Sequence, residues 1–419
     1  MQFVKWFYPG IGIKRWIILC ILGLGLIVIV ALMAVRTLSQ TSVMLASFAT
    51  ATLIFGIFMV YTAIKNMVRI FVRALMPSDK THPLVDLVYQ RRQTESLARG
   101  PRVVVVGGGT GLSTLLSGVK LFTTNITAIV TVTDTGGSSG RLRDEMDMLP
   151  PGDIRNCLVA LADAGPLIRD LFQYRFETGE GLQGHSFGNL FITALSKVTG
   201  DFEKAVAESS KVLNIRGRVM PSTLEKVQLV GEFMDGTIAE GETTITELQK
   251  PLKNIRLKPD DCKACPEALD AIENADLILL GPGSLYTSIL PNVLIQDIHN
   301  ALLKSDAYKA YIANVMTQPG ETVGFSTWDH LRVLIEHTDP RITNAVFVNV
   351  QPIPKELILR YREKGAAPVV KDFDIIRAKG YDVVEGEILK FDGQVRHDPE
   401  KLAQMIFDHY YKVEKMAKA

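Results

Sequence analysis

Two glycine-rich turns carry the residue types best suited to binding phosphate. The first follows the apolar run Val103–Val106, and the second follows the apolar run 128–133. A glycine turn between a buried strand and a helix presents backbone N–H groups and the helix N-terminus to an anion. We therefore predict that both turns lie in one cleft that binds a phosphorylated ligand. The candidate contacts in these turns are Gly108, Gly109, Thr110, Gly111, Asp134, Gly136, Gly137, Ser138 and Ser139.

The first turn does not match the dinucleotide-binding pattern G-x-G-x-x-G. Counted from Gly107, that pattern requires a glycine at the position of Leu112. Asp134 lies near the place of the acidic residue that binds ribose in NAD sites, but it leads into a second glycine turn, which such sites lack. NAD-dependent redox chemistry is therefore the less favoured alternative.

Three further segments place small and hydrogen-bonding residues beside apolar runs. Pro150–Asn156 and Gly184–Asn189 each precede an apolar helical run, and helix capping by Asp153 or Ser186 explains only part of their composition. Gly281–Ser288 follows an apolar strand, and ligands of open α/β sheets bind at the carboxyl ends of strands. These segments add the candidate contacts Arg155, Asn156, His185, Asn189, Gly283, Ser284, Tyr286 and Ser288.

Four carboxylates in these motifs would suit a divalent cation. Mg²⁺ prefers one or two carboxylates together with phosphate oxygens. Asp134, Asp144, Glu145 and Asp153 are therefore candidates to bind Mg²⁺ together with a nucleotide diphosphate. The motifs show no evident pair of nucleophile and base. This favours a binding protein over an enzyme, with a metal-dependent phosphotransferase as the alternative.

The cysteines indicate neither a disulfide framework nor an evident metal centre. Cys262 and Cys265 form a single C-x-x-C, whereas structural zinc usually requires two further ligands at regular spacing. We expect a loop with two free thiols, with metal or redox use as the alternative.

Charge is distributed unevenly along the 419 residues. Residues 1–75 hold seven Lys and Arg and no Asp or Glu, so the rest of the chain is net negative. A net negative domain is a poor binder of nucleic acid, which excludes that class of partner. Within the basic segment, residues 16–35 and 43–64 are uncharged apolar runs, each long enough to cross a bilayer as a helix.

We predict that residues 1–75 form a transmembrane helical hairpin. A signal peptide has one shorter apolar region, and a buried hairpin is the other alternative. Lys and Arg flank both outer ends, and only Arg36 lies in the connection, so the positive-inside rule places both outer ends in the cytoplasm. The expected location is the plasma membrane, multi-pass, with a juxtamembrane linker over residues 76–100 and the large domain in the cytoplasm.

Residues 101–419 predict one α/β domain. Short β-rich runs alternate with helical patterns, and continuous apolar strands are typical of parallel sheets covered on both faces. We expect a Rossmann-like, mostly parallel sheet with helices on both faces, ending in a helix that Asp398 caps and Pro399 begins. The expected strands are 102–106, 128–133, 275–280, 310–315 and 345–350.

Seven motifs in a fixed order resemble one protein family. They are GGGTGLS, TDTGGSSGRLR, PPGDIRN, GHSFGNL, GPGSLYTSILPN, NVMTQPGET and VRHD. Over residues 101–410 the chain is similar to the YvcK-type gluconeogenesis factors, which share a superfamily with the 2-phospho-L-lactate transferase CofD. The two N-terminal apolar runs lie outside the usual soluble pattern of this family.

The resemblance implies a nucleotide-binding domain whose ligand is a UDP-sugar such as UDP-N-acetylglucosamine. By similarity, Tyr361 and Arg396 hold that ligand. The implied role is to support cell shape and envelope synthesis during gluconeogenic growth, with cell-envelope synthesis proteins and a second copy of the chain as expected partners. In the transferase branch, the implied chemistry is transfer of a phospholactyl group with a divalent cation. No cofactor other than Mg²⁺ is expected.

Cysteine labelling in intact cells tests the predicted orientation. A membrane-impermeant maleimide should react with the variant Ser39→Cys, because position 39 lies in the connection between the two apolar runs. The variant Ser78→Cys should react only after the cells are permeabilised. Labelling of Ser78→Cys from outside would show that the hairpin has the opposite orientation.

Overall fold

The computed structural model describes residues 13–36, 43–75 and 96–418. Contacts divide the chain into two units, Met1–Gln90 and Arg91–Ala419, each of which is described by itself. Of the expected linker 76–100, only residues 96–100 are among those described.

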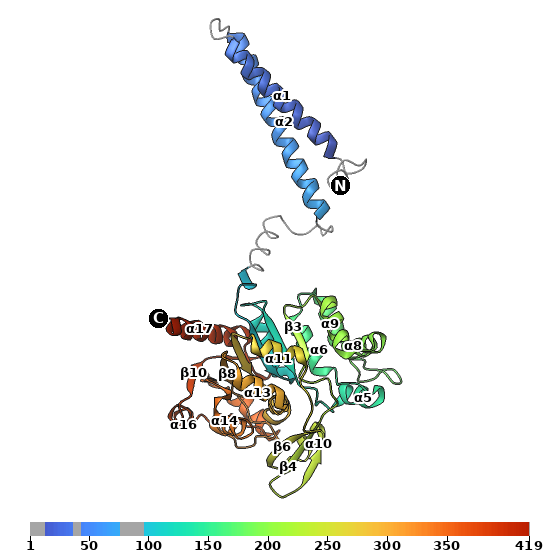
Figure 1. The fold of residues 1–419 in the computed structure, drawn as a ribbon, viewed down its shortest axis with the longest axis vertical. Helices are drawn as coiled ribbons and strands as arrows, with labels where there is room; N and C mark the ends of the chain where they lie inside the picture. Colours follow the sequence, from blue (N-terminus) through green and yellow to red (C-terminus); the bar gives the residue numbers. More distant parts are fainter. Residues whose placement is uncertain (1–12, 37–42, 76–95, 419) are drawn as a thin grey trace. The chain divides into compact units, whose positions relative to one another are not determined.

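The first unit consists of two helices, α1 (Ile13–Arg36) and α2 (Val43–Leu75), packed side by side (Figure 1). Their backbones meet at two glycines: a Cβ built on Gly23 would lie 2.9 Å from the carbonyl oxygen of Gly56. Small residues allow apolar helices to approach this closely. The segments Arg15–Ala34 and Ser47–Arg69 are long and apolar enough to be candidate membrane spans.

A seven-stranded parallel sheet forms the centre of the second unit, in the order β10-β9-β8-β7-β1-β2-β3. The expected α/β fold is therefore confirmed, and all five expected strands are present with shifted ends. The edge strands β3 and β10 were not expected from the sequence, because they are short and partly exposed. The strands are β1 (Val103–Gly107), β2 (Ile126–Val130), β3 (Arg218–Pro221), β7 (Leu277–Leu280), β8 (Tyr308–Ile312), β9 (Ala345–Asn349) and β10 (Asp382–Gly386).

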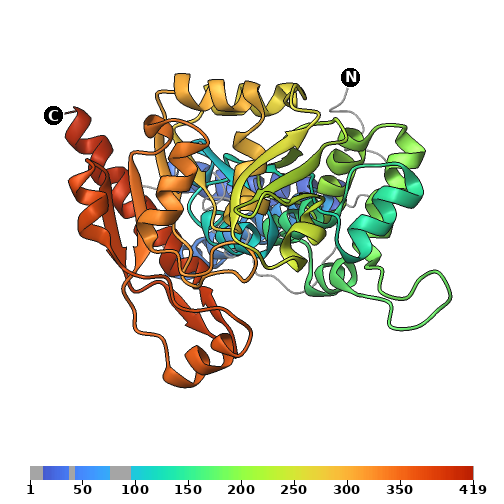
Figure 2. The same ribbon diagram turned by 90° about the horizontal axis from the view of Figure 1, so that it is seen from below.

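Helices cover both faces of this sheet (Figure 2). In the views of Figures 1 and 2, the green helices lie toward the β3 end and the orange and red helices toward the β10 end. The helices are α4 (Gly109–Val119), α5 (Gly137–Met146), α6 (Gly152–Leu161), α7 (Pro166–Gln173), α8 (Phe187–Thr199), α9 (Phe202–Leu213), α10 (Glu242–Glu247), α11 (Pro266–Glu273), α12 (Leu290–Val293), α13 (Gln296–Lys304), α14 (Thr327–Glu336), α15 (Lys355–Arg362), α16 (Phe373–Ala378) and α17 (Pro399–Lys418).

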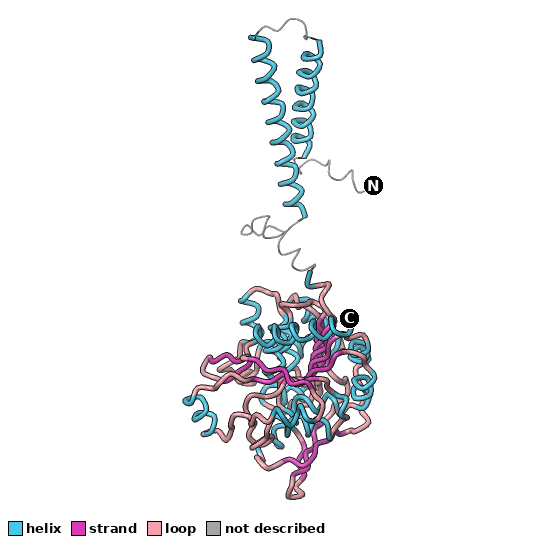
Figure 3. Tube along the Cα trace, turned by 90° about the vertical axis from the view of Figure 1, so that its left-hand side faces the viewer, coloured by secondary structure: helices cyan, strands magenta, loops and turns pink. Residues whose placement is uncertain are grey.

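Two small antiparallel sheets were missed by the sequence analysis. One consists of β4 (Gln228–Phe233), β5 (Ile238–Glu240) and β6 (Leu252–Lys258), and it projects from the unit in Figures 1 and 3. The other is the hairpin of β11 (Leu389–Phe391) and β12 (Val395–His397). The strands β6 and β12 mix buried and exposed residues, and the buried run of β4 is only three residues long, so they lack the continuous apolar runs that mark the main sheet.

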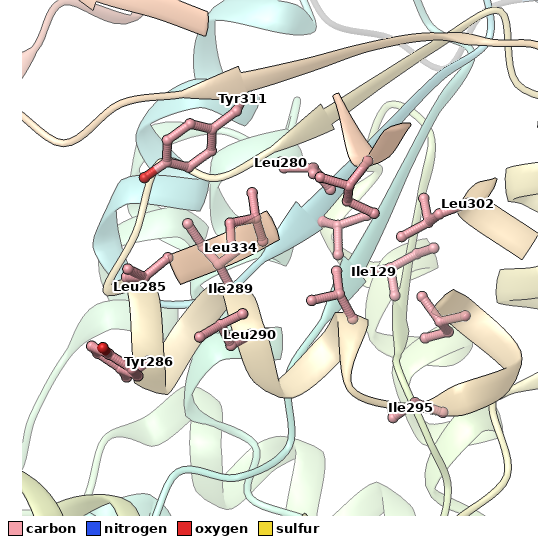
Figure 4. Close-up of a cluster of buried hydrophobic side chains, with 14 of the residues drawn as sticks. Ile129, Leu280, Leu285, Tyr286, Ile289, Leu290, Ile295, Leu302, Tyr311 and Leu334 are labelled. Atoms are coloured by element: carbon pink, nitrogen blue, oxygen red, sulfur yellow. The ribbon is translucent and has the colours of Figure 1, made fainter. Parts of the chain in front are cut away.

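The sheet separates two hydrophobic cores. In β1, Val104 and Val106 face one core, whereas Val103 and Val105 face the other. Successive side chains of a strand point to opposite faces, so a strand covered on both sides must be apolar at every position. Figure 4 shows part of the first core, where Ile129 of β2 and Leu280 of β7 lie near residues of the turn that follows β7.

The C-terminal helix α17 closes the second core against α4. As expected, Asp398 caps α17, accepting from the backbone N–H of Glu400 at 3.1 Å. The two helices touch backbone to backbone, because a Cβ built on Gly118 of α4 would overlap the carbonyl oxygen of Pro399.

The close approach of α4 and α17 can be tested with Gly118→Ala. The added methyl group has no space, so we expect a loss of about 3 kcal/mol in the free energy of unfolding. Gly165→Ala is the matched control, because a Cβ there meets no atom within 4 Å and φ is −56°. Chemical denaturation measures the free energy of unfolding of both variants. Equal values would contradict the close contact between α4 and α17.

Candidate functional site

The first glycine turn lies where the sheet grows in two directions. From β1 the sheet continues through β2 to β3 on one side, and through β7 to β10 on the other. In open α/β sheets, ligands bind outside the carboxyl ends of the two strands at such a switch point. The turn after β1 and the turn after β7 therefore occupy the expected place of a ligand site.

These two turns touch each other through their backbones. A Cβ built on Gly111 would lie 2.5 Å from the carbonyl oxygen of Pro282, and one on Gly283 would lie 3.2 Å from that of Gly108. Gly109 has φ of +67°, in the left-handed region that favours glycine. The glycines are thus required by the contact itself, whether or not a ligand is bound.

A cleft of about 520 Å³ opens beside the two turns. The remaining walls come from the loop after β8, the end of α15 and the strand β12. Five segments that are far apart in the sequence therefore share one cavity. The lining residues are Thr110, Gly111, Thr114, Pro282, Gly283, Ser284, Asn314, Val315, Met316, Thr317, Gln318, Pro319, Tyr361, Lys364, Ala366, Gln394, Val395, Arg396 and His397.

Tyr361 and Arg396 reach this cleft from separate elements that a hydrogen bond joins. The hydroxyl oxygen of Tyr361 accepts from the backbone N–H of Val395 at 3.1 Å, which ties the end of α15 to β12. Arg396 is the next residue of that strand, opposite Lys390 of β11, and its side chain is exposed. The structure therefore brings both residues together with Thr110, Gly111 and the turn after β7.

A buried carboxylate orders two walls of the cleft. Glu321, which is 4% exposed, accepts from the hydroxyl of Thr287 at 3.0 Å and from Nε2 of Gln318 at 2.7 Å. Gln318 uses its other amide atom to contact the hydroxyl of Ser284. Burial raises the pKa of Glu321 to about 7, while the hydrogen bonds oppose that shift. Glu321 belongs to the motif NVMTQPGET, which follows the strand β8.

Tyr286 and Ser288 serve the turn after β7 in different ways. The ring of Tyr286 is 2% exposed and packs in the hydrophobic core, as Figure 4 shows. The π-helical turn Leu285–Ile289 directs this side chain inward, so Tyr286 does not line the cleft. Ser288 lies where the turns after β1 and β7 meet, with its Oγ 3.5 Å from a Cβ built on Gly109.

Asp153 does not cap its own helix but contacts the first glycine turn. Its carboxylate accepts from the backbone N–H of Gly109, and a Cβ on Gly108 would lie 2.7 Å from its Oδ2. The backbone N–H of Gly109, which the sequence predicts to bind phosphate, is therefore already bound to a carboxylate. Burial raises the pKa of Asp153 to about 6, and the Gly109 hydrogen bond opposes that shift.

The second glycine turn lies on the other side of Asp153 and does not line the cleft. The carboxylate of Asp134 accepts from the N–H of Gly136 at 2.8 Å, and a Cβ on Gly152 would lie 3.1 Å from its Oδ2. Burial, followed by the charges of Asp134 and Asp153, raises the pKa of Glu242 to about 8. These three carboxylates thus form one acidic group.

The other expected cation ligands lie elsewhere. Asp144 and Glu145 are exposed on α5, beyond its first turn, so they do not join the acidic group. Glu242 takes their place. It begins the short helix α10 after β5, outside the motifs that drew attention in the sequence.

Four predicted contacts lie together beside the second glycine turn instead of in the cleft: Arg155, Asn156, His185 and Asn189. Nη2 of Arg155 donates to the side-chain oxygen of Asn156 at 2.7 Å, and Nη1 contacts the hydroxyl of Ser186. Ser186 also caps α8, accepting from the N–H of Asn189 at 3.2 Å. The single cleft predicted from the sequence is therefore two neighbouring regions, separated by Asp153.

The C-x-x-C segment forms the expected loop with two free thiols. Cys262 and Cys265 are buried between β6 and α11, and Sγ of Cys265 donates to the carboxylate of Glu267 at 3.2 Å. Burial raises the pKa of Cys262 to about 11 and that of Cys265 to about 12, so both thiols are protonated at neutral pH.

The raised pKa of Glu242 predicts a pH dependence of stability. A folded-state pKa of about 8, against an ordinary 4.5, means that the folded protein holds this proton more tightly than the unfolded chain does. The resulting stability is full below about pH 4.5 and is lost as the pH rises through about 8. Glu242→Gln removes the ionisation, so its melting temperature in EDTA should fall less than that of the wild type between about pH 5 and 8. Glu247→Gln, exposed on the same helix, is the control and should follow the wild type; parallel curves for all three would contradict the assignment.

Comparison with known proteins supports the fold of the second unit. The family described as 2-phospho-L-lactate transferase CofD matches residues 103–389. A crystal structure of a protein from Bacillus halodurans is 47% identical, with a TM-score of 0.72, and the match covers 74% of this chain and 100% of that chain. The solved protein therefore corresponds to the second unit.

Relatives differ in how much of the chain they match. The gluconeogenesis factor of Bacillus subtilis (strain 168) is 47% identical over 74% of this chain and 99% of its own length. A relative from Nostoc sp. (strain PCC 7120), whose name also refers to a gluconeogenesis factor, is 43% identical over 98% of this chain and 93% of its own length. The chain therefore belongs to the CofD family, among its gluconeogenesis-factor homologues.

Proposed function

We propose that this protein is a UDP-sugar-binding regulator, anchored in the plasma membrane by its N-terminal helices, with the large domain in the cytoplasm. The observation that carries the proposal is the convergence of the α4 N-terminus, Tyr361 and Arg396 on one cleft. The family resemblance supports a role in cell shape and envelope synthesis, and the names of the relatives support a role in gluconeogenesis.

The chemistry of the cleft suits a nucleotide-diphosphate sugar. The helix α4 has no side-chain cap, so backbone N–H groups at Thr110 and Gly111 are available for one phosphate. The guanidinium of Arg396 can bind a second phosphate through two parallel hydrogen bonds. The ring of Tyr361 offers a face for stacking on uracil or sugar. A volume of about 520 Å³ lies within the range of small-molecule sites.

Amide side chains provide the remaining polar contacts. Asn314, Gln318 and Gln394 line the cleft and can donate and accept hydrogen bonds at the same time. Such groups suit the hydroxyls of a sugar and the edge of uracil. A binding regulator needs only these contacts, whereas an enzyme needs reacting groups in addition.

A metal-dependent phosphotransferase is the second candidate, and the acidic group favours it. Asp134, Asp153 and Glu242 are the type of ligand that Mg²⁺ prefers together with phosphate oxygens. A cation there would favour the ionised form of each carboxylate and neutralise phosphate charge. The acidic group lies beside the cleft rather than in it, which leaves UDP-sugar binding as the leading proposal.

Calorimetry of the full chain in detergent with UDP-N-acetylglucosamine tests the proposal. Arg396→Ala should weaken binding by about 1.5–3 kcal/mol, because a charge-assisted hydrogen bond is lost. Tyr361→Ala should cost about 1 kcal/mol, whereas Tyr361→Phe keeps the ring and loses only the contact with Val395. Arg396→Lys should restore binding incompletely, because Lys offers a point charge instead of a planar fork.

The control for these variants is Lys390→Ala. Lys390 lies opposite Arg396 in the hairpin but does not line the cleft, so its loss should leave the affinity unchanged. Titrations with NAD and GDP complete the comparison. Tighter binding of NAD or GDP than of the UDP-sugar, or an unaffected Arg396→Ala variant, would refute the proposed ligand.

A further inference from the structure

Three buried side chains at the second glycine turn form a hydrogen-bonded group that is separate from the cleft. Oγ of Ser138 lies 3.0 Å from Nδ1 of His185, and Nδ2 of Asn189 donates to the same Oγ at 3.1 Å. Ser138 is 4% exposed, His185 is 3% exposed and Asn189 is 2% exposed. A serine hydroxyl within hydrogen-bond distance of an imidazole is the arrangement of an activated nucleophile.

The direction of these hydrogen bonds can be derived from their chemistry. The amide nitrogen of Asn189 donates, so it occupies one of the two lone pairs of Ser138 Oγ and leaves the serine hydrogen free. We assign that hydrogen to Nδ1 of His185, which lies 3.0 Å away and then accepts it. In this arrangement His185 is the tautomer that carries its proton on Nε2, and Nδ1 is the base.

The surroundings keep His185 neutral. Its pKa lies below the ordinary 6.5, first because burial disfavours the charged imidazolium and then because of the positive charges of Arg141 and Arg175; Glu145 opposes these effects. Ser138, which contacts His185, and Asn189, which donates to Ser138, are uncharged. A neutral imidazole at physiological pH can accept the serine proton.

The group stands at a helix N-terminus and includes polar atoms without a partner. Ser138 is the second residue of α5, whose first residues carry free backbone N–H groups and no side-chain cap. Oδ1 of Asn189 and Nε of Arg155 are both buried without a hydrogen-bond partner. Ser186 already caps α8, so helix capping does not explain the presence of these two buried polar atoms. The N–H groups of α5 would stabilise negative charge that develops beside Ser138.

We propose that Ser138 is a nucleophile, with His185 as its general base, for an electrophilic phosphorus centre such as that of a phosphate ester or anhydride. Ser138 Oγ forms a bond to phosphorus while the bond from phosphorus to the leaving oxygen breaks. The hydroxyl proton moves to Nδ1 of His185 and from there to the leaving oxygen, which departs with the electron pair of its bond to phosphorus. Neutral His185 then takes a proton from water, whose oxygen forms a bond to the phosphorus of the phosphoserine. The bond from Oγ to phosphorus breaks, His185 returns the proton to Oγ, and the phosphoryl product is released.

A nucleophile at Ser138 is compatible with any ligand in the cleft. It replaces the expectation, drawn from the sequence, that the motifs contain no nucleophile and base: Ser138 and His185 are 47 residues apart and only the fold joins them. Hydrolysis beside a nucleotide site would be compatible with a regulatory role, because breaking a phosphoanhydride bond is how nucleotide switches are reset.

A fluorophosphonate probe tests the proposal without knowledge of the natural substrate. When Ser138 attacks the probe, the oxygen–phosphorus bond forms, fluoride leaves, and the proton passes to His185. Mass spectrometry of the labelled full chain in detergent should locate the adduct on Ser138. The variant His185→Gln should react about 100-fold more slowly, because the general base is lost. The rate for the wild type should rise with pH, with a midpoint below 6.5.

Matched variants separate a chemical role from a structural one. Ser138→Ala should abolish labelling, whereas Ser139→Ala should keep it, because Ser139 is equally buried but is not bonded to His185. Asn189→Asp should slow labelling, since a carboxylate would accept the serine hydrogen and draw it away from His185. Melting temperatures would confirm that each variant is folded. No adduct on the wild type, or an adduct that persists in Ser138→Ala, would overturn the proposal.

Discussion

The contact between the turns after β1 and β7 is the constraint on which the site depends. Gly111 touches the backbone of Pro282, and Gly108 fits between the turn after β7 and Asp153 with no room for a side chain. Because the two strands are neighbours at the switch point, their turns must share this space. The same contact leaves the N-terminus of α4 open toward the cleft and places Ser288 beneath it. Every other wall is positioned relative to this backbone junction.

Buried carboxylates are the second organising feature of the region. Asp153, Glu242 and Glu321 each have a pKa well above the ordinary value, because burial makes their charged forms costly. Each accepts a backbone N–H group, so some N–H groups of the turns near them are already hydrogen-bonded to a carboxyl oxygen. The anion binding that we propose for the cleft therefore relies on the α4 N-terminus and on Arg396, rather than on all the N–H groups of both turns.

The second unit thus contains two neighbouring regions with different chemistry. The cleft is lined by amides, an aromatic ring and exposed cations, which suit reversible binding of a polar ligand. The region of the second turn holds carboxylates and the pair Ser138 and His185, which suit proton transfer. Relatives that match only this unit show that it occurs without the N-terminal helices, whereas others match the whole chain.

Local sequence patterns were sufficient to predict most strands of the main sheet and the start of the C-terminal helix. Continuous apolar runs predicted five of the seven parallel strands, and the Asp398–Pro399 pair predicted the start of α17. Which loops share a cavity depends on the order of the strands in the sheet, and local sequence patterns do not predict that order. The tertiary structure joined Tyr361 and Arg396 to the first turn, turned Tyr286 into the core, and placed Asp153 between the two glycine turns. The edge strands β3 and β10 and the strands of the two small sheets were not predicted. Such short segments form strands because they pair with distant parts of the chain, rather than because of their own composition.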